Sequence, residues 1–268
     1  MKIKKSIFLK SIFFLSALLF LGGDFSFANA DTKWYPGHYI FIADANLEGM
    51  YSQVGDIPSI RGVQRSYYWD ELEPTKDNYD FSKITNEANY LRERGWKMII
   101  QIQTRTFGKG TQNQKIPAYL KTATYNYGAY YAESGASTVL YGDAKVFERF
   151  TLLLRAMGKA LDSNNVIAGI NMHESGISPP IKEHWLYPIW TTYKVRHGEN
   201  ILRIDQLGRE VFPTTPFVQY YGAGSMPAGQ FESLALKKGF GIGNPDTVLR
   251  GWYELKEDGS KILDSWKL

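Results

Sequence analysis

Short apolar segments alternate with helical patterns along this chain, and this alternation restricts its fold more than any other feature of the sequence. The clearest helical pattern covers Lys145–Ser163, where apolar residues recur at the spacing of one buried stripe. Strands that alternate with helices predict a parallel sheet covered by helices, which is an α/β fold. The six segments that we expect to be strands are Tyr39–Asp44, Val63–Trp69, Trp96–Ile102, Val166–Ser175, Phe217–Tyr221 and Gly239–Gly243.

Helices and irregular connections are expected between these strands. The connection Thr106–Asp143 is too long for a simple turn, and loops of this length are usually functional walls or lids. The aromatic-rich segment Lys182–Val195 is a second expected wall, and the Gly- and Pro-containing segment after Asp44 is expected to be irregular. The expected helices are Ser82–Arg94, Lys145–Ser163, Asn200–Gly208 and Phe231–Lys238.

Residues 1–30 have the pattern of a secretory signal peptide. Four lysines precede a short apolar stretch, Ile12–Leu21, and Ala28-Asn29-Ala30 offers a small-residue cleavage site. The apolar stretch is about half of the ~20 residues that a membrane-spanning helix needs, so an uncleaved anchor is the weaker alternative. We therefore expect a secreted or periplasmic protein that is cleaved after Ala30, has no stable membrane insertion and forms a single domain over residues 31–268.

The composition excludes several classes of function. The expected mature chain has 27 basic and 26 acidic residues, so no basic surface indicates a nucleic-acid partner. The absence of cysteine excludes a disulfide scaffold, a thiol nucleophile and cysteine-bound metal. The four histidines lack the spacing of zinc ligands, and the sequence has neither a serine-hydrolase elbow nor a phosphate-binding loop. We therefore expect no metal and no cofactor.

The fourth expected strand ends abruptly in the polar residues Asn171, His173 and Glu174. In α/β barrels, catalytic side chains lie at the carboxyl ends of the strands, so Glu174 is a candidate general acid or base. The alternative is a structural ion pair between this strand-end carboxylate and a nearby arginine.

A segment after the second expected strand resembles a known group of enzymes. Trp69-Asp-Glu-Leu-Glu-Pro74 is followed by Tyr79-Asp-Phe-Ser82 and by Leu91-Arg-Glu-Arg-Gly95. Together they resemble the W-x-x-L-E-P-x-x-G-x-Y-D-F segment of family 42 and related β-galactosidase-like glycoside hydrolases of clan A, with Asp77 in place of the usual glycine. The resemblance covers roughly Tyr39–Asp246. It implies a (β/α)8 barrel of the TIM-barrel type that cleaves O-glycosidic bonds in an oligo- or polysaccharide.

The length of the chain conflicts with a full barrel of this type. A complete barrel usually needs ~250 residues, and the tail Leu249–Leu268, with a hairpin signal at Asp258-Gly259, is too short for two further strand–helix units. Either the barrel is incomplete after about six strands, or the segments assigned to loops contain further strands.

The resemblance also implies roles for particular residues. The acid/base of clan A is a Glu at the end of the fourth strand, usually preceded by an Asn that binds the sugar 2-hydroxyl. Glu174 matches that Glu, and His173 stands in the position of the Asn. The clan's nucleophile, a Glu after the seventh strand, has no counterpart in this sequence.

The remaining candidates complete the expected site. Asp246, after the sixth expected strand, is the candidate second catalytic carboxylate, and a turn-capping Asp is the alternative for it. For Glu71 and Glu73 the resemblance implies a structural role. Trp185 and Trp190 are candidates for stacking on sugar rings, with core packing as the alternative. The candidate substrate-binding residues are Arg65, Trp69, Gln101, Gln103, Arg105, Asn171, His173, Gln219 and Tyr221. The alternative function is a non-catalytic barrel that binds carbohydrate.

Overall fold

The computed structural model describes residues 32–106, 114–222, 230–243, 253–255 and 261–263. All of these residues belong to one of the two compact units into which the chain divides, Thr32–Leu268. The segment assigned to a signal peptide and the candidate Asp246 lie outside the described residues. Export, cleavage after Ala30 and the single-domain organisation therefore stay predictions.

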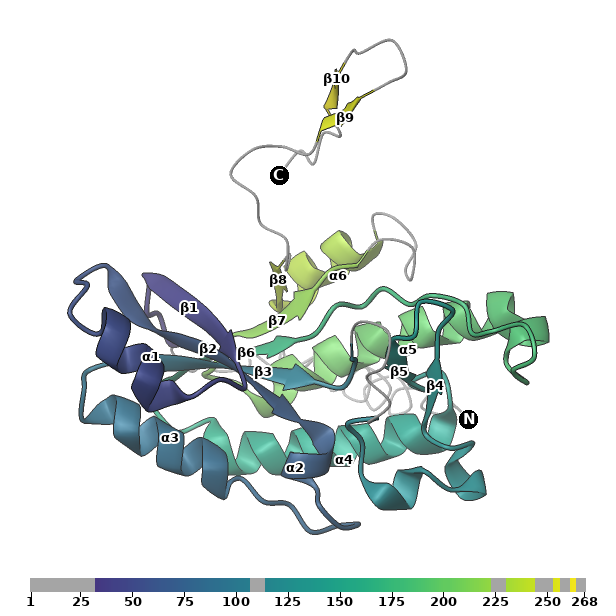
Figure 1. The fold of residues 1–268 in the computed structure, drawn as a ribbon, viewed down its shortest axis with the longest axis horizontal. Coiled ribbons are helices and arrows are strands. Elements are labelled where there is room, and N and C mark those ends of the chain that lie inside the picture. The colour runs from purple at the N-terminus through teal and green to yellow at the C-terminus, as the bar shows by residue number, and fades with distance from the viewer. Residues whose placement is uncertain (1–31, 107–113, 223–229, 244–252, 256–260, 264–268) are drawn as a thin grey trace, which may run out of the picture. The chain divides into compact units, whose positions relative to one another are not determined.

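Six parallel strands form one sheet in the order β1-β2-β3-β6-β7-β8 (Figure 1). Every neighbouring pair in this sheet is parallel, as the alternation of strands and helices predicts. The six strands correspond to the six apolar segments of the sequence, which confirms the α/β class. The strands are β1 (His38–Ala43), β2 (Ile60–Tyr68), β3 (Lys97–Gln103), β6 (Ile167–Met172), β7 (Phe217–Tyr220) and β8 (Gly241–Gly243).

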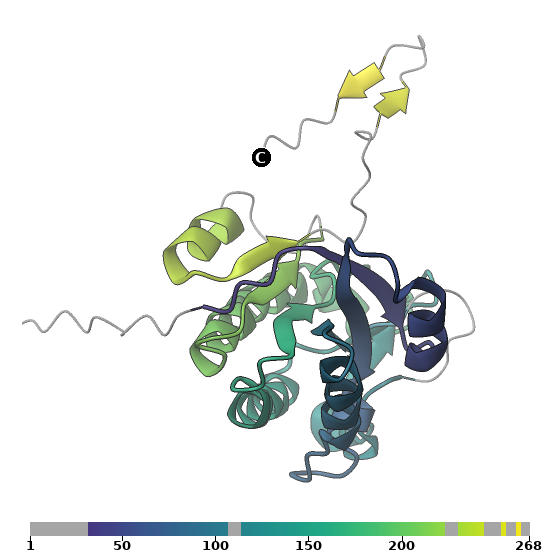
Figure 2. The ribbon, with the colours of Figure 1, turned by 90° about the vertical axis from the view of Figure 1, so that its left-hand side faces the viewer.

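In the six-stranded sheet, a helix follows each of the first five strands before the next strand of that sheet begins. Figures 1 and 2 show α3, α4 and α5 side by side along one face of the sheet. Within α4, the predicted stripe is buried from Val146 to Leu161, and the side chain of Asp143 caps the helix by accepting from two backbone N–H groups. The helices between consecutive strands are α1 (Leu47–Val54), α3 (Ser82–Arg92), α4 (Ala144–Leu161), α5 (Trp190–Val211) and α6 (Gln230–Lys238).

The two faces of the sheet have different characters. On the outer face, which meets the helices, Val63, Met98 and Ile170 are fully buried. On the opposite, inner face, the strand register places Ser66 beside Gln101 and Gln101 beside Asn171. Ser66, Gln101 and Asn171 are themselves buried, at 3%, 7% and 5% exposure, whereas Phe41 of β1, which lies beside Gln64, is 57% exposed. The inner face is therefore polar and largely buried along β2, β3 and β6, and it is exposed at the edge strand β1.

Several elements differ from the sequence-based expectations. Helix α1 occupies part of the segment expected to be irregular, because the Asn46 side chain accepts from Gly49 N at 2.5 Å and caps it. Helix α5 begins at Trp190, ten residues earlier than expected, and includes part of the second expected wall. The long connection after β3 contains the antiparallel pair β4 (Ala129–Tyr131) and β5 (Ser137–Val139). The long connection is therefore partly folded into strands, and its role as a wall or lid stays a prediction.

The remaining elements are short. Helix α2 (Trp69–Leu72) directly follows β2, and three 3-10 helices cover Ala118–Leu120, Ala123–Tyr125 and Tyr187–Ile189. The antiparallel pair β9 (Tyr253–Leu255) and β10 (Lys261–Leu263) agrees with the hairpin signal in the tail. In the described part of the chain, no helix has the length and apolar character needed to cross a membrane.

Candidate active site

Glu174 lies two residues beyond the end of β6, the fourth strand in the sheet. Its side chain is 27% exposed, and its Oε2 lies 3.7 Å from Nη1 of Arg105. Arg105 lies two residues beyond β3, which pairs with β6. Neighbouring parallel strands thus bring both side chains to the carboxyl edge of the sheet, where barrel enzymes have their catalytic groups.

A hydrogen-bonded network of neutral side chains covers the inner face below this edge. Gln103 accepts from Gln101 Nε2 at 3.2 Å, and Gln101 accepts from Gln64 Nε2 at 2.9 Å. Gln64 Oε1 in turn accepts from Tyr220 OH at 2.8 Å and from Asn171 Nδ2 at 3.2 Å. The network contains amides and a phenol, which both donate and accept hydrogen bonds, as do the hydroxyl groups of sugars.

His173 lies on the other side of the strand ends and is almost fully buried. Its Nε2 is 3.0 Å from Thr104 Oγ1, which is 2.7 Å from the hydroxyl of Tyr141. Burial lowers the pKa of His173 to about 3, and the nearby charges of Arg105 and His197 act in the same direction. The imidazole is therefore neutral, and its Nε2 is engaged with the buried hydroxyl group of Thr104. The sugar contact implied by the resemblance stays a prediction.

Three further candidate residues are buried in contacts within the protein. Arg65 faces helix α3, where its Nε lies 2.5 Å from Glu87 Oε2. Trp69 is fully buried against Phe150. Gln219 is fully buried and donates from Nε2 to the carbonyl oxygen of His173 at 2.6 Å. For these three, the structure shows structural contacts.

The aromatic candidates divide into exposed and packed residues. Trp185 is 45% exposed and lies in the segment between Glu174 and α5. Trp190 stacks on Tyr193, and Tyr221 stacks on Phe231 of α6. Of these rings, that of Trp185 is the most accessible to a ligand.

The comparisons with known proteins concern the fold. No protein-family model and no curated protein matches the sequence. Among solved structures, the β-galactosidase of Marinomonas ef1 is 10% identical, with a TM-score of 0.50 over 74% of this chain. The β-galactosidase of Halorubrum lacusprofundi is also 10% identical, with a TM-score of 0.50 over 74% of this chain. The β-galactosidase of Rahnella sp. R3 is 11% identical, with a TM-score of 0.49 over 75% of this chain.

These matches show a fold and only part of it. The chain spans 38–39% of the length of the three β-galactosidases. Over that part it has the α/β fold of TIM-barrel glycosidases, as expected from the sequence. The closer likeness to family 42 stays a prediction, because identities of 10–11% show the fold alone.

Residues that the sequence does not single out also lie in or near the candidate site. Gln64 and Tyr220 link the amides of the inner face. Asp70 lies just beyond β2, at the same edge of the sheet as Glu174. Burial raises the pKa of Asp70, and the charge of Lys115 opposes that shift. The sequence offers a sign for both residues. Gln64 stands next to Arg65 in a strand with alternating side chains, and Asp70 belongs to the motif that carries the resemblance.

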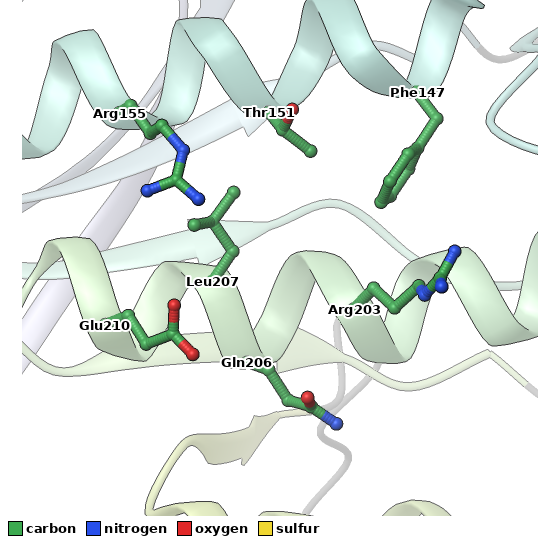
Figure 3. A pocket seen from close by; sticks show the side chains of 7 residues that line it. All are labelled: Phe147, Thr151, Arg155, Arg203, Gln206, Leu207 and Glu210. Atoms are coloured by element: carbon green, nitrogen blue, oxygen red, sulfur yellow. The ribbon is translucent and has the colours of Figure 1, made fainter. Parts of the chain in front are cut away.

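A surface cavity between α4 and α5 is a separate feature (Figure 3). Its volume is about 280 Å³, and Phe147 and Arg155 of α4 face Leu207 and Glu210 of α5 across it. The walls come from two helices, and none of the predicted site residues lines them. In the described part of the chain, no three His, Asp or Glu residues gather closely enough to hold a metal ion. This cavity is therefore separate from the candidate residues at the carboxyl edge of the sheet.

Proposed function

We propose that this protein is an exported glycoside hydrolase-like enzyme that cleaves O-glycosidic bonds in an oligo- or polysaccharide, with Glu174 as the general acid/base. The observation that carries the proposal is the partly exposed carboxyl group at the end of the fourth strand, beside Arg105 and above a neutral polar surface. The glycosidase-like fold supports it. Export rests on the leader sequence alone.

The chemistry requires Glu174 to exchange a proton with the glycosidic oxygen. In its acid form it would donate that proton as the bond between the sugar carbon and the oxygen breaks, and water would supply the hydroxyl group that the sugar carbon gains. A second carboxyl group would either attack the sugar carbon or take the proton from that water. The two carboxyl groups would be about 5–5.5 Å apart for retention and about 6.5–9.5 Å apart for inversion. Asp246 and Asp70 are the candidates for this second role.

The second candidate function is carbohydrate binding without turnover. It is favoured by the composition of the hydrogen-bonded network, in which Gln64, Gln101, Gln103, Asn171 and Tyr220 provide no carboxyl group. Gln64 and Tyr220 are partly exposed and can exchange hydrogen bonds with hydroxyl groups, but none of the five residues can transfer a proton to a glycosidic oxygen. The two functions share one surface and differ in turnover.

Hydrolysis assays on matched variants test the proposal. Purified wild-type protein is incubated with a panel of aryl glycosides and polysaccharides beside Glu174→Gln, with Glu71→Gln as a control that removes an exposed carboxylate of the same size. We expect Glu174→Gln to lower kcat by about a hundredfold or more and Glu71→Gln to leave it unchanged. Sugar affinity without any turnover in the wild type would favour the binding function instead. If the wild type hydrolyses a substrate, Asp246→Asn and Asp70→Asn show which carboxyl group is the second one, because hydrolysis requires that group.

A further inference from the structure

Three carbonyl oxygens in the segment around Glu174 are each held by a side chain from a different element. The oxygen of His173 accepts from Gln219 Nε2 of β7 at 2.6 Å. The oxygen of Ser175 pairs with His197 Nε2 of α5 at 3.2 Å, and that of Gly176 accepts from Arg105 Nη1 at 2.5 Å. The main chain is therefore fixed on both sides of Glu174.

The contact made by His197 defines the protonation of its ring. A carbonyl oxygen only accepts hydrogen bonds, so Nε2 of His197 must carry the proton. Burial lowers the pKa of His197 to about 4, so the ring holds this single proton at neutral pH and Nδ1 carries none. The ring is also held in place by Tyr141 and Tyr193, whose centroids lie 6.0 Å and 6.3 Å away. His197 is therefore a fixed donor that is aimed at the residue after Glu174.

Gln219 makes the matching contact on the other side. Its side chain is fully buried, and its Nε2 also donates to the carbonyl oxygen of Tyr220 at 2.8 Å. That same oxygen accepts from Ser175 N at 3.0 Å. The end of β7 and the segment of Glu174 are thus joined by side-chain and main-chain hydrogen bonds.

The two chain segments also approach each other too closely for larger residues. A Cβ atom on Gly222 would lie 2.5 Å from Gly176 N, so the contact depends on glycine at position 222. In addition, Gly222 N donates to Ser175 Oγ at 2.9 Å. The segment that carries Glu174 is therefore packed against the strand end behind it.

We propose that His197 and Gln219 are positioning residues, which hold the main chain on the two sides of Glu174 so that its carboxyl group meets the glycosidic oxygen in one orientation. Neither residue touches the substrate. Proton transfer needs such alignment, and a displacement of ~1 Å can lower a rate by about a hundredfold. This proposal rests on the proposed acid/base role of Glu174.

The test compares two variants of His197 on substrates with different leaving groups. His197→Phe keeps a planar ring of similar size but removes the donor, whereas His197→Gln keeps an N–H donor at a similar reach. A phenyl glycoside needs a proton on its leaving oxygen, whereas a dinitrophenyl glycoside has a leaving group that departs without one. We expect His197→Phe to lower kcat/KM for the phenyl glycoside by about tenfold to a hundredfold and for the dinitrophenyl glycoside by less than about threefold. His197→Gln should restore most of the loss.

An equal loss on both substrates, or no loss on either, would overturn the positioning role. If His197→Phe does not fold, Gln219→Met tests the same prediction from the opposite side of Glu174, with the same two substrates. If the wild-type protein hydrolyses neither substrate, the proposed function fails by itself, and a carbon-13 NMR titration of the Glu174 carboxyl group decides the positioning role. A titration midpoint that moves in His197→Phe and returns in His197→Gln supports that role, and an unchanged midpoint overturns it.

Discussion

Two glutamate–arginine pairs of this protein have opposite surroundings. Glu73, just beyond α2, has no exposed surface, and its partner Arg149 is 7% exposed. Glu174, beyond β6, is 27% exposed, and its oxygen lies 3.7 Å from Arg105. One pair is enclosed between helices and loops, and the other is at the accessible edge of the sheet.

The difference extends to the hydrogen bonds of each carboxylate. Glu73 Oε2 accepts from Trp69 Nε1 at 2.9 Å, and Glu73 Oε1 accepts from Asp77 N at 3.0 Å as well as from Arg149. Arg149 also donates to Asp77 Oδ1 at 2.7 Å. A buried carboxylate that accepts from this set of donors is fully hydrogen-bonded and serves the fold. Trp69 and Glu73 belong to the motif that carries the family resemblance, and the contact between them stabilises the fold. The chemistry proposed for Glu174 instead needs a carboxyl group that a substrate can reach.

The largest expected effect is the loss of stability in Glu73→Gln. This variant removes one charge from a buried pair, which costs about 3 kcal/mol and lowers Tm by about 6–12 °C. Glu174→Gln, the same chemical change at the exposed pair, is expected to lower Tm by less than about 2 °C. Thermal unfolding of the two variants beside the wild type measures both values. Equal losses of stability would mean that the two pairs have the same role.

The next effect is the pH dependence of the free energy of unfolding that His173 and His197, the buried histidines near Glu174, cause. Burial lowers the pKa of His173 to about 3 and that of His197 to about 4, whereas an unfolded histidine titrates near 6.5. Below that value the unfolded chain takes up protons that the folded chain does not, so the free energy of unfolding falls as pH falls. We expect a loss of about 1 kcal/mol for each histidine between about pH 6.5 and about pH 5.5.

Urea unfolding at several pH values measures this loss. His197→Gln should reduce the slope of the free energy of unfolding against pH by the contribution of one histidine. His38→Gln replaces an exposed side chain at the start of β1 and should leave that slope unchanged. A slope that does not depend on His197 would show that its buried ring is not the cause. Within the described part of the chain, the hydrogen bonds of Glu73 involve no buried imidazole, so the pH dependence should belong to the Glu174 region.

The sequence predicts most of the fold because burial imposes periodicity. The stripe from Val146 to Leu161 and the six apolar segments identify α4 and the strands. Capping by Asn46 made α1 possible despite Gly49, and this local contact is not visible in the hydrophobic pattern. The beginning of α5 was missed because the polar and aromatic residues from Trp190 onward do not form a clear apolar stripe.

The candidate site is predicted in part for the same physical reasons. Strand ends place Glu174 and Arg105 at one edge, so their proximity follows once β3 and β6 are neighbours. Alternation also shows that Gln64 and Arg65 face opposite sides of β2. It does not show which side is the inner one, because β2 is largely buried on both faces. The buried position of His173 depends on Thr104 and Tyr141, which are distant in sequence.

A smaller effect is expected at the tryptophans associated with the two pairs. Trp69 is fully buried beside Glu73, whereas Trp185 is 45% exposed in the segment after Glu174. If Trp185 stacks on a sugar ring, Trp185→Ala should weaken oligosaccharide binding by about 1 kcal/mol, or roughly fivefold in Kd, with little change for an aryl monoglycoside. Calorimetric titration with saccharides of increasing length measures this difference. Trp34→Ala, at another exposed tryptophan, is the control, and an equal effect there would contradict a specific contact.

The smallest expected effect is at a third ion pair, which is more exposed than the other two. Glu71 pairs with Lys83 at 3.2 Å, and the side chains are 37% and 43% exposed. Glu71→Gln removes the charge but keeps an oxygen that can accept from Tyr68 N, as Glu71 does at 3.2 Å. We expect the free energy of unfolding to change by less than about 0.5 kcal/mol, because water screens an exposed pair. Urea unfolding in parallel with Glu73→Gln measures the change, and a loss near that of Glu73→Gln would mean that burial does not set the strength of these pairs.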